Sequence, residues 1–88
     1  MSNILRCDLH DYLEIACLYQ YQTTLVLSSG EQYSGVPKTT ITKNRDGVKY
    51  EVLVVDCEGG QVKEIELLRL KSMHVETPHA KFTDVSFI

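Results

Sequence analysis

The sequence predicts a mainly β protein of the α+β class: an N-terminal α-helix followed by a small, bent antiparallel barrel or sandwich of five to six strands. Two observations predict this class. An apolar stripe with helical spacing occurs near the N-terminus, whereas from Gln22 onward β-branched and apolar residues form short runs separated by turn residues. The length of 88 residues allows one modest hydrophobic core, so we expect a single domain over residues 1–88.

The helix is expected over residues 8–19. Asp8 is a favourable N-cap residue, and Asp11 lies three positions further on, where a carboxylate also suits the positive end of the helix dipole. The core-facing stripe comprises Leu9, Leu13, Ala16, Cys17 and Gln20, with Tyr12 beside it. The opposite side comprises Asp8, Asp11, Glu14, Ile15 and Leu18. This arrangement predicts an outward face that is acidic at its start and apolar further on, as in some protein contact sites.

Strands are expected over residues 22–28, 31–36, 48–57, 61–68 and 70–75, with a possible edge strand over residues 81–88. The short link Ser28-Ser-Gly30 makes the first two strands a hairpin. Gly35 predicts a bend or bulge, and Pro37 predicts that the second strand ends or bends there. The strand over 48–57 has apolar residues on both faces, which predicts a central position in the sheet.

Residues 38–47 are expected to form the longest irregular connection, because they end in the turn signal Asp46-Gly47. In the strand expected over residues 61–68, Glu64 and Glu66 alternate with Ile65 and Leu67. This alternation predicts that the two glutamates form a solvated face while the two apolar residues enter the core.

The charge distribution argues against a protein that coats RNA. The net charge is −3, and residues 1–35 carry one basic side chain against four acidic ones. Residues 36–49 carry four basic side chains against one acidic, and residues 50–88 four against seven. Because phosphate neutralisation supplies most of the affinity for RNA, an RNA-coating protein shows a broad basic face, and here the basic cluster is short.

Cysteine content and the absence of targeting signals indicate a cytoplasmic protein. The three cysteines are odd in number and lack paired spacing, which does not make a disulfide framework. The N-terminal residues lack the apolar region of a signal peptide, and no apolar run approaches the ~20 residues of a membrane span. We therefore expect a cytoplasmic location and no membrane partner.

Motifs for metal binding or catalysis are incomplete. Cys7 and His10 have the Cys-x-x-His spacing of half a zinc site, but no second paired module follows. His74 and His79 lack the context of a nucleophile and base, and Gly59-Gly60 joins two strands and not a strand and a helix. We therefore expect no enzyme activity, metal, cofactor or small-molecule substrate.

The order of elements resembles the Sm-like fold, through Leu25-Val-Leu-Ser-Ser-Gly-Glu31, Gly35 and Tyr50-Glu-Val-Leu-Val-Val55. A more specific resemblance is to the bacterial Rho-binding antiterminator family, Rof, also called YaeO. It is carried by Cys7-Asp-x-x-Asp-x-Leu-Glu-Ile-Ala-Cys17, Thr24-Leu-x-Leu27, Gly30-Glu31 and Leu53-Val-Val-Asp56. The resemblance covers residues 7–75, while the connection over 39–48 is longer than the family pattern and the C-terminal tail differs.

The resemblance implies an inhibitor of Rho-dependent transcription termination. Members of this family bind the N-terminal primary RNA-binding region of the Rho hexamer and compete with RNA loading. Carboxylates on a helix can pair with the basic groups of such a groove. The candidate partner-binding residues are Asp8, His10, Asp11, Glu14, Ile15, Leu18, Lys43, Asn44 and Arg45. For Asp8 a capping role is compatible with partner contact.

Two other functions fit the pattern less well. One is an Sm-like RNA-binding module that acts as an oligomeric ring, for which the basic residues 38–49 near Tyr50 give the best support. The other is an adaptor with a different protein partner. Since most of the chain is acidic, we expect no direct binding of nucleic acid.

Overall fold

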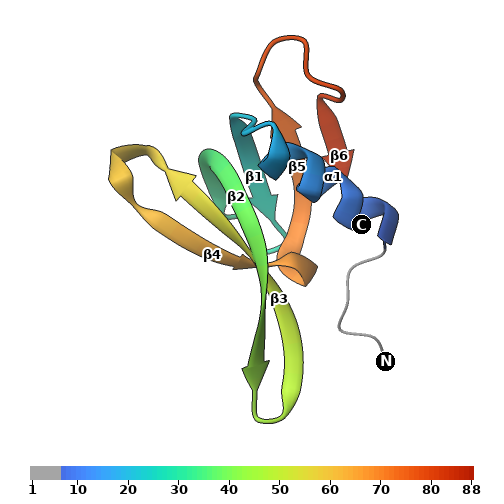
Figure 1. Ribbon diagram of the computed structural model, residues 1–88, viewed down its shortest axis with the longest axis vertical. Coiled ribbons are helices and arrows are strands. Elements are labelled where there is room, and N and C mark those ends of the chain that lie inside the picture. The colour runs from blue at the N-terminus through green and yellow to red at the C-terminus, as the bar shows by residue number, and fades with distance from the viewer. Residues whose placement is uncertain (1–6) are drawn as a thin grey trace.

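The computed structural model describes residues 7–88, which form a helix packed on one antiparallel sheet (Figure 1). The elements are α1 (Cys7–Leu18), β1 (Thr23–Leu27), β2 (Gln32–Arg45), β3 (Val48–Cys57), β4 (Val62–Glu66), β5 (Leu70–Val75) and β6 (Asp84–Ser86). Two short 3-10 helices, η1 (Glu58–Gly60) and η2 (Leu67–Arg69), precede β4 and β5. The predicted mainly β class with an N-terminal helix and up to six strands is confirmed.

The sheet is open, and its strand order is β4-β3-β2-β1-β5-β6. The edges are β4 and β6, so the sheet does not close into the barrel that was one form of the prediction. The strand predicted over 61–68 ends at Glu66 because its last two residues enter η2, and the possible strand over 81–88 shortens to Asp84–Ser86. As predicted, β3 is an internal strand, between β2 and β4.

The predicted irregular connection over residues 38–47 is wrong. β2 continues through Pro37 to Arg45 and pairs with β3 as far as Arg45 opposite Val48. The register shifts between Pro37 and Thr39, so Lys38 forms a bulge that absorbs the interruption caused by proline. The resulting β2–β3 hairpin extends well beyond the helix and the other strands (Figure 1).

Gly35 allows the neighbouring strands β2 and β3 to lie very close together. A Cβ atom at this position would lie 2.6 Å from the backbone oxygen of Asp56 and 2.9 Å from Cγ1 of Val55. The fully buried hydroxyl of Thr23 donates a hydrogen bond of 2.9 Å to the Gly35 carbonyl oxygen, which fixes β1 against the same point. Glycine is therefore required here because of space.

The core lies between α1 and one face of the sheet. Leu13 and Ala16 of the helix are fully buried against apolar side chains from the strands. These residues come from the strands, from η2 and, for Phe87, from just after β6: Leu25, Leu27, Leu53, Val55, Ile65, Leu67, Leu70, Met73, Val75, Val85 and Phe87. Burial of Ile65 and Leu67, with Glu64 exposed and Glu66 partly exposed, agrees with the predicted alternation. The apolar area removed from water at these positions is the main source of stability.

The short edge strand β6 is joined to β5 by a side-chain ion pair. His74 and Asp84 are directly opposite in register, and Nδ1 of His74 lies 2.8 Å from Oδ1 of Asp84. The hydrogen bond to Asp84 raises the pKa of His74 above its ordinary 6.5, and the same bond lowers the pKa of Asp84 below 3.8. We therefore expect the contribution of this ion pair to the β5–β6 contact to depend on pH.

We expect the thermal stability conferred by this ion pair to depend on pH. A raised histidine pKa gives a contribution that is complete below pH 6.5 and is lost as pH rises through the folded-state value. A lowered aspartate pKa gives a contribution that is complete above pH 3.8 and is lost as pH falls through the folded-state value. The difference in Tm between wild type and Asp84→Asn should therefore be largest between pH 3.8 and 6.5 and decline on both sides.

Thermal unfolding followed by circular dichroism between about pH 3 and 9 measures this difference across the relevant pKa values. Asp46→Asn, at the exposed tip of the β2–β3 hairpin, is the control and should show no such maximum. A Tm difference for Asp84→Asn that stays constant across the range would show that the ion pair contributes nothing.

Candidate protein-interaction surface

The outward side of α1 presents carboxylates. Asp8, Asp11 and Glu14 are all exposed, whereas Leu13 and Ala16 face the sheet. Asp8 lies within the first turn of α1, which begins at Cys7, and not at the N-cap position that was predicted for it. Its carboxylate is still near the positive end of the helix dipole. The structure thus places the three predicted acidic residues on one exposed side of a single helix.

The apolar candidates on α1 differ in exposure. Leu18 has 74% of its surface exposed, as expected for a contact residue. Ile15 is only partly exposed and packs against the core, so its predicted outward position is wrong. The connection between β5 and β6 reaches the helix at Tyr12, whose ring contacts that of Phe82. At the other end of the predicted stripe, Gln20 lies beyond the helix and is exposed.

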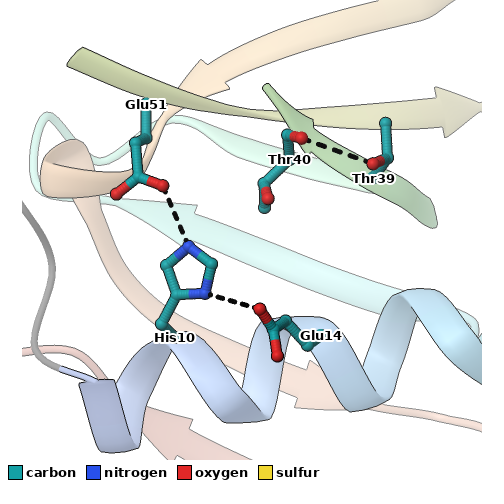
Figure 2. Close-up of polar contacts among 5 residues, drawn as sticks. All are labelled: His10, Glu14, Thr39, Thr40 and Glu51. Atoms are coloured by element: carbon teal, nitrogen blue, oxygen red, sulfur yellow. Dashed lines mark hydrogen bonds and ion pairs between the residues drawn. The ribbon is translucent and has the colours of Figure 1, made fainter. Parts of the chain in front are cut away.

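His10 links the helix to β3. Figure 2 shows its ring between two carboxylates, with Nε2 3.0 Å from Oε2 of Glu51 and Nδ1 3.3 Å from Oε1 of Glu14. The side chain of His10 is 18% exposed and that of Glu14 is 61% exposed. His10 therefore faces the protein more than the solvent, and its contact with Glu14 holds one carboxylate of the outward side in place. The contact of His10 with Glu51 was not predicted, because the two residues are 41 positions apart in the sequence.

A shallow groove lies between the second half of α1 and the bulge in β2. Its volume is about 320 Å³, and it is lined by Glu14, Cys17, Leu18, Lys38, Thr39 and Thr40. Two of the predicted contact residues, Glu14 and Leu18, are on its helical wall. Figure 2 shows Thr39 and Thr40 on β2, across from Glu14. Lys38, at the bulge, and the two threonines that follow it form the strand side of this groove, in a segment that was predicted to be irregular.

Cys17 forms part of the same groove but is not activated as a nucleophile. Partial burial, and secondarily the charge of Glu14, raise the pKa of its thiol from 9.0 to about 11. The reactive thiolate is therefore scarce at neutral pH. Among residues 7–88, no group of three metal-ligating side chains lies close enough to hold an ion.

The predicted contact residues Lys43, Asn44 and Arg45 lie at the far end of the β2–β3 hairpin, in a strand and not in a loop. Lys43 forms an ion pair with Glu64, and Nη2 of Arg45 lies 2.9 Å from Oε1 of Glu66. These carboxylates raise the pKa values of Lys43 and Arg45. Glu64 and Glu66, predicted to form only a solvated face, therefore partly neutralise the basic cluster.

Two further contacts fix this end of the hairpin. The guanidinium of Arg45 lies 4.3 Å from the centre of the Tyr50 ring. The side-chain oxygen of Asn44 accepts a hydrogen bond of 2.9 Å from the backbone N–H of Gly47, which closes the turn. Asn44 therefore has a structural role, and the structure does not bring residues 43–45 together with the acidic side of α1.

The fold is a small open antiparallel sheet covered by one helix, whose outward face exposes acidic and apolar side chains. A family model described as modulator of Rho-dependent transcription termination (ROF) matches residues 4–87. The chain belongs to this family, which is regulatory and not enzymatic. No helix within residues 7–88 is long and apolar enough to cross a membrane.

One solved structure is similar over nearly the whole chain. It is described as YaeO bound to magnesium, from Vibrio cholerae O395, and has 29% sequence identity and a TM-score of 0.75. The match covers 89% of this chain and 96% of that protein. A comparison with curated proteins gave no match. The fold and the family predicted from the sequence are thus both confirmed.

Proposed function

We propose that this protein inhibits Rho-dependent termination by binding the N-terminal primary RNA-binding region of the Rho hexamer and competing with RNA loading. The observation that carries the proposal is the exposed acidic side of α1 in a chain of the ROF family. The inhibitor would act in the cytoplasm, where Rho meets nascent RNA.

The chemistry of the two surfaces is complementary. A groove that binds single-stranded RNA is basic and carries stacking side chains. Asp11 and Glu14 are rigidly held on α1 and expose their carboxylates, so they can occupy positions that phosphates would otherwise take. Charges at the rim of an interface chiefly accelerate and orient the encounter, while buried apolar contacts slow dissociation. Leu18, beside Glu14 in the groove, is suited to the second role.

The β2–β3 hairpin is a weaker candidate for contact with Rho. Lys43 and Arg45 are held by Glu64 and Glu66, so a partner would have to compete with these ion pairs. We therefore assign the main contact to α1 and a secondary one to residues 43–45.

The direct test is displacement of a labelled, cytidine-rich RNA from Rho by the purified protein. We expect fluorescence anisotropy of the RNA to fall as protein is added, and we expect the protein alone to leave the anisotropy of free RNA unchanged. Light scattering on the same sample measures its oligomeric state. An oligomer that binds the RNA without Rho would support the RNA-binding ring instead, and retention of RNA on Rho at saturating protein would reject competition.

A further inference from the structure

Aromatic rings form a continuous row beside the acidic side of α1. Ring centres of Tyr12 and Phe82 are 5.1 Å apart, those of Phe82 and Tyr21 are 5.8 Å apart, and those of Tyr21 and Tyr19 are 5.8 Å apart. The first two pairs are edge-to-face and the third is stacked, which are favourable arrangements. We call Tyr12, Tyr19 and Phe82 the aromatic patch.

The inner members of the row hold the outer ones in position. Tyr21 is buried, and its hydroxyl oxygen accepts a hydrogen bond of 3.0 Å from the backbone N–H of Lys81. This bond fixes the β5–β6 connection. The connection carries Phe82, whose ring contacts those of Tyr12 and Tyr21. Tyr12 and Tyr19 nevertheless keep 39% and 51% of their surfaces exposed. Large aromatic side chains that are rigid and exposed are the usual anchors of protein interfaces.

The chemistry around the patch favours cations. The ammonium nitrogen of Lys81 already lies 5.5 Å from the centre of the Tyr19 ring, so this ring meets a positive charge within the molecule. Asp8 is four residues before Tyr12 and therefore lies on the same side of α1. Aromatic faces next to carboxylates suit a guanidinium, which can stack on the ring and donate hydrogen bonds to the acid. Phosphates would be repelled by the same carboxylates.

We propose that the aromatic patch is an anchor for arginine side chains of the protein partner, with Tyr12 as its main contact residue. This inference rests on the proposed function, because it extends the α1 contact with Rho from the carboxylates to the adjacent rings. The acidic residues would set the rate of encounter, and the rings would set the lifetime of the complex. Lys81 is exposed, so it can leave Tyr19 when a partner's arginine takes its place.

The test compares Rho binding of Tyr12→Ala/Tyr19→Ala, Tyr12→Phe and a control, by surface plasmon resonance at two salt concentrations. We expect the double variant to bind about 10-fold more weakly, mainly through faster dissociation, with unchanged salt dependence. Tyr12→Phe should bind nearly as wild type, because phenylalanine keeps the ring face. Val62→Ala is the control, since Val62 is 63% exposed on the edge strand β4; it should also bind as wild type.

Circular dichroism and Tm show whether the variants are folded, and Tyr19→Ala replaces the double variant if loss of the Tyr12–Phe82 contact unfolds it. Binding of the alanine variant within twofold of wild type would overturn this inference while leaving the proposed function intact. Failure of wild type to bind Rho would instead reject the proposed function, and the anchor with it.

Discussion

Replacing Asp11 and Glu14 together by lysine is expected to weaken binding to Rho by about 10- to 100-fold at low salt. Each exposed charge pair contributes about 0.2–1 kcal/mol, and reversal converts an attraction into a repulsion, while 1.4 kcal/mol corresponds to a factor of ten in affinity. Both carboxylates are exposed on one helix, so both can meet the same basic surface. The loss should fall mainly on the association rate.

Salt dependence and a charge-matched control make this result specific. Wild-type binding should weaken as ionic strength rises, and the double variant should lose most of that dependence. The control is Asp56→Lys/Glu58→Lys, which changes the net charge equally at exposed positions where β3 meets η1, far from α1 (Figure 1). If the control loses as much affinity as the α1 variant, net charge and not the helix face governs binding.

Glu14 requires one additional comparison because of its contact with His10. Glu14→Gln removes the charge while keeping a side chain that can accept a hydrogen bond from the imidazole. We expect this variant to unfold at nearly the same temperature as wild type and to bind Rho less tightly than wild type, but more tightly than the double lysine variant. The comparison separates partner contact from the structural link to β3.

The local pattern predicted those parts of the fold in which neighbouring residues determine the outcome. The spacing of Leu13 and Ala16 predicted the buried side of α1, and the alternation around Ile65 predicted the inward side of β4. At Pro37 the strand was predicted to end or bend, and the predicted end at residue 36 is wrong, because the strand is only interrupted by a shift in register and continues to Arg45. The bulge at Lys38 lets the ladder continue, and the run Thr39-Thr-Ile-Thr42 is β-branched, so its strand propensity is consistent with the observed pairing.

The interaction surface was predictable only where it depends on α1 itself. Helical spacing placed Asp11 and Glu14 outside, but it could not show that Ile15 packs partly against the core, because that packing depends on segments distant in the sequence. For the same reason the contacts of His10 with Glu51 and of Lys43 with Glu64 were not foreseen. Contacts between distant segments depend on register, which a single sequence leaves open.

Substitution of Gly35 by alanine is expected to be the most destabilising single change considered, with a loss of about 3 kcal/mol or more in the free energy of unfolding. The added methyl would lie 2.6 Å from the backbone oxygen of Asp56, and a backbone atom in a paired strand cannot move aside as a flexible side chain can. Relief therefore requires separation of β2 from β3 at the point where Thr23 is also bonded. Urea denaturation measures the loss.

Gly59→Ala is the matched control: its φ of +82° strains alanine, but no atom lies within 4 Å of the new Cβ, so we expect a cost of only about 1 kcal/mol. Equal losses for the two variants would show that β2 and β3 are not in such close contact at Gly35.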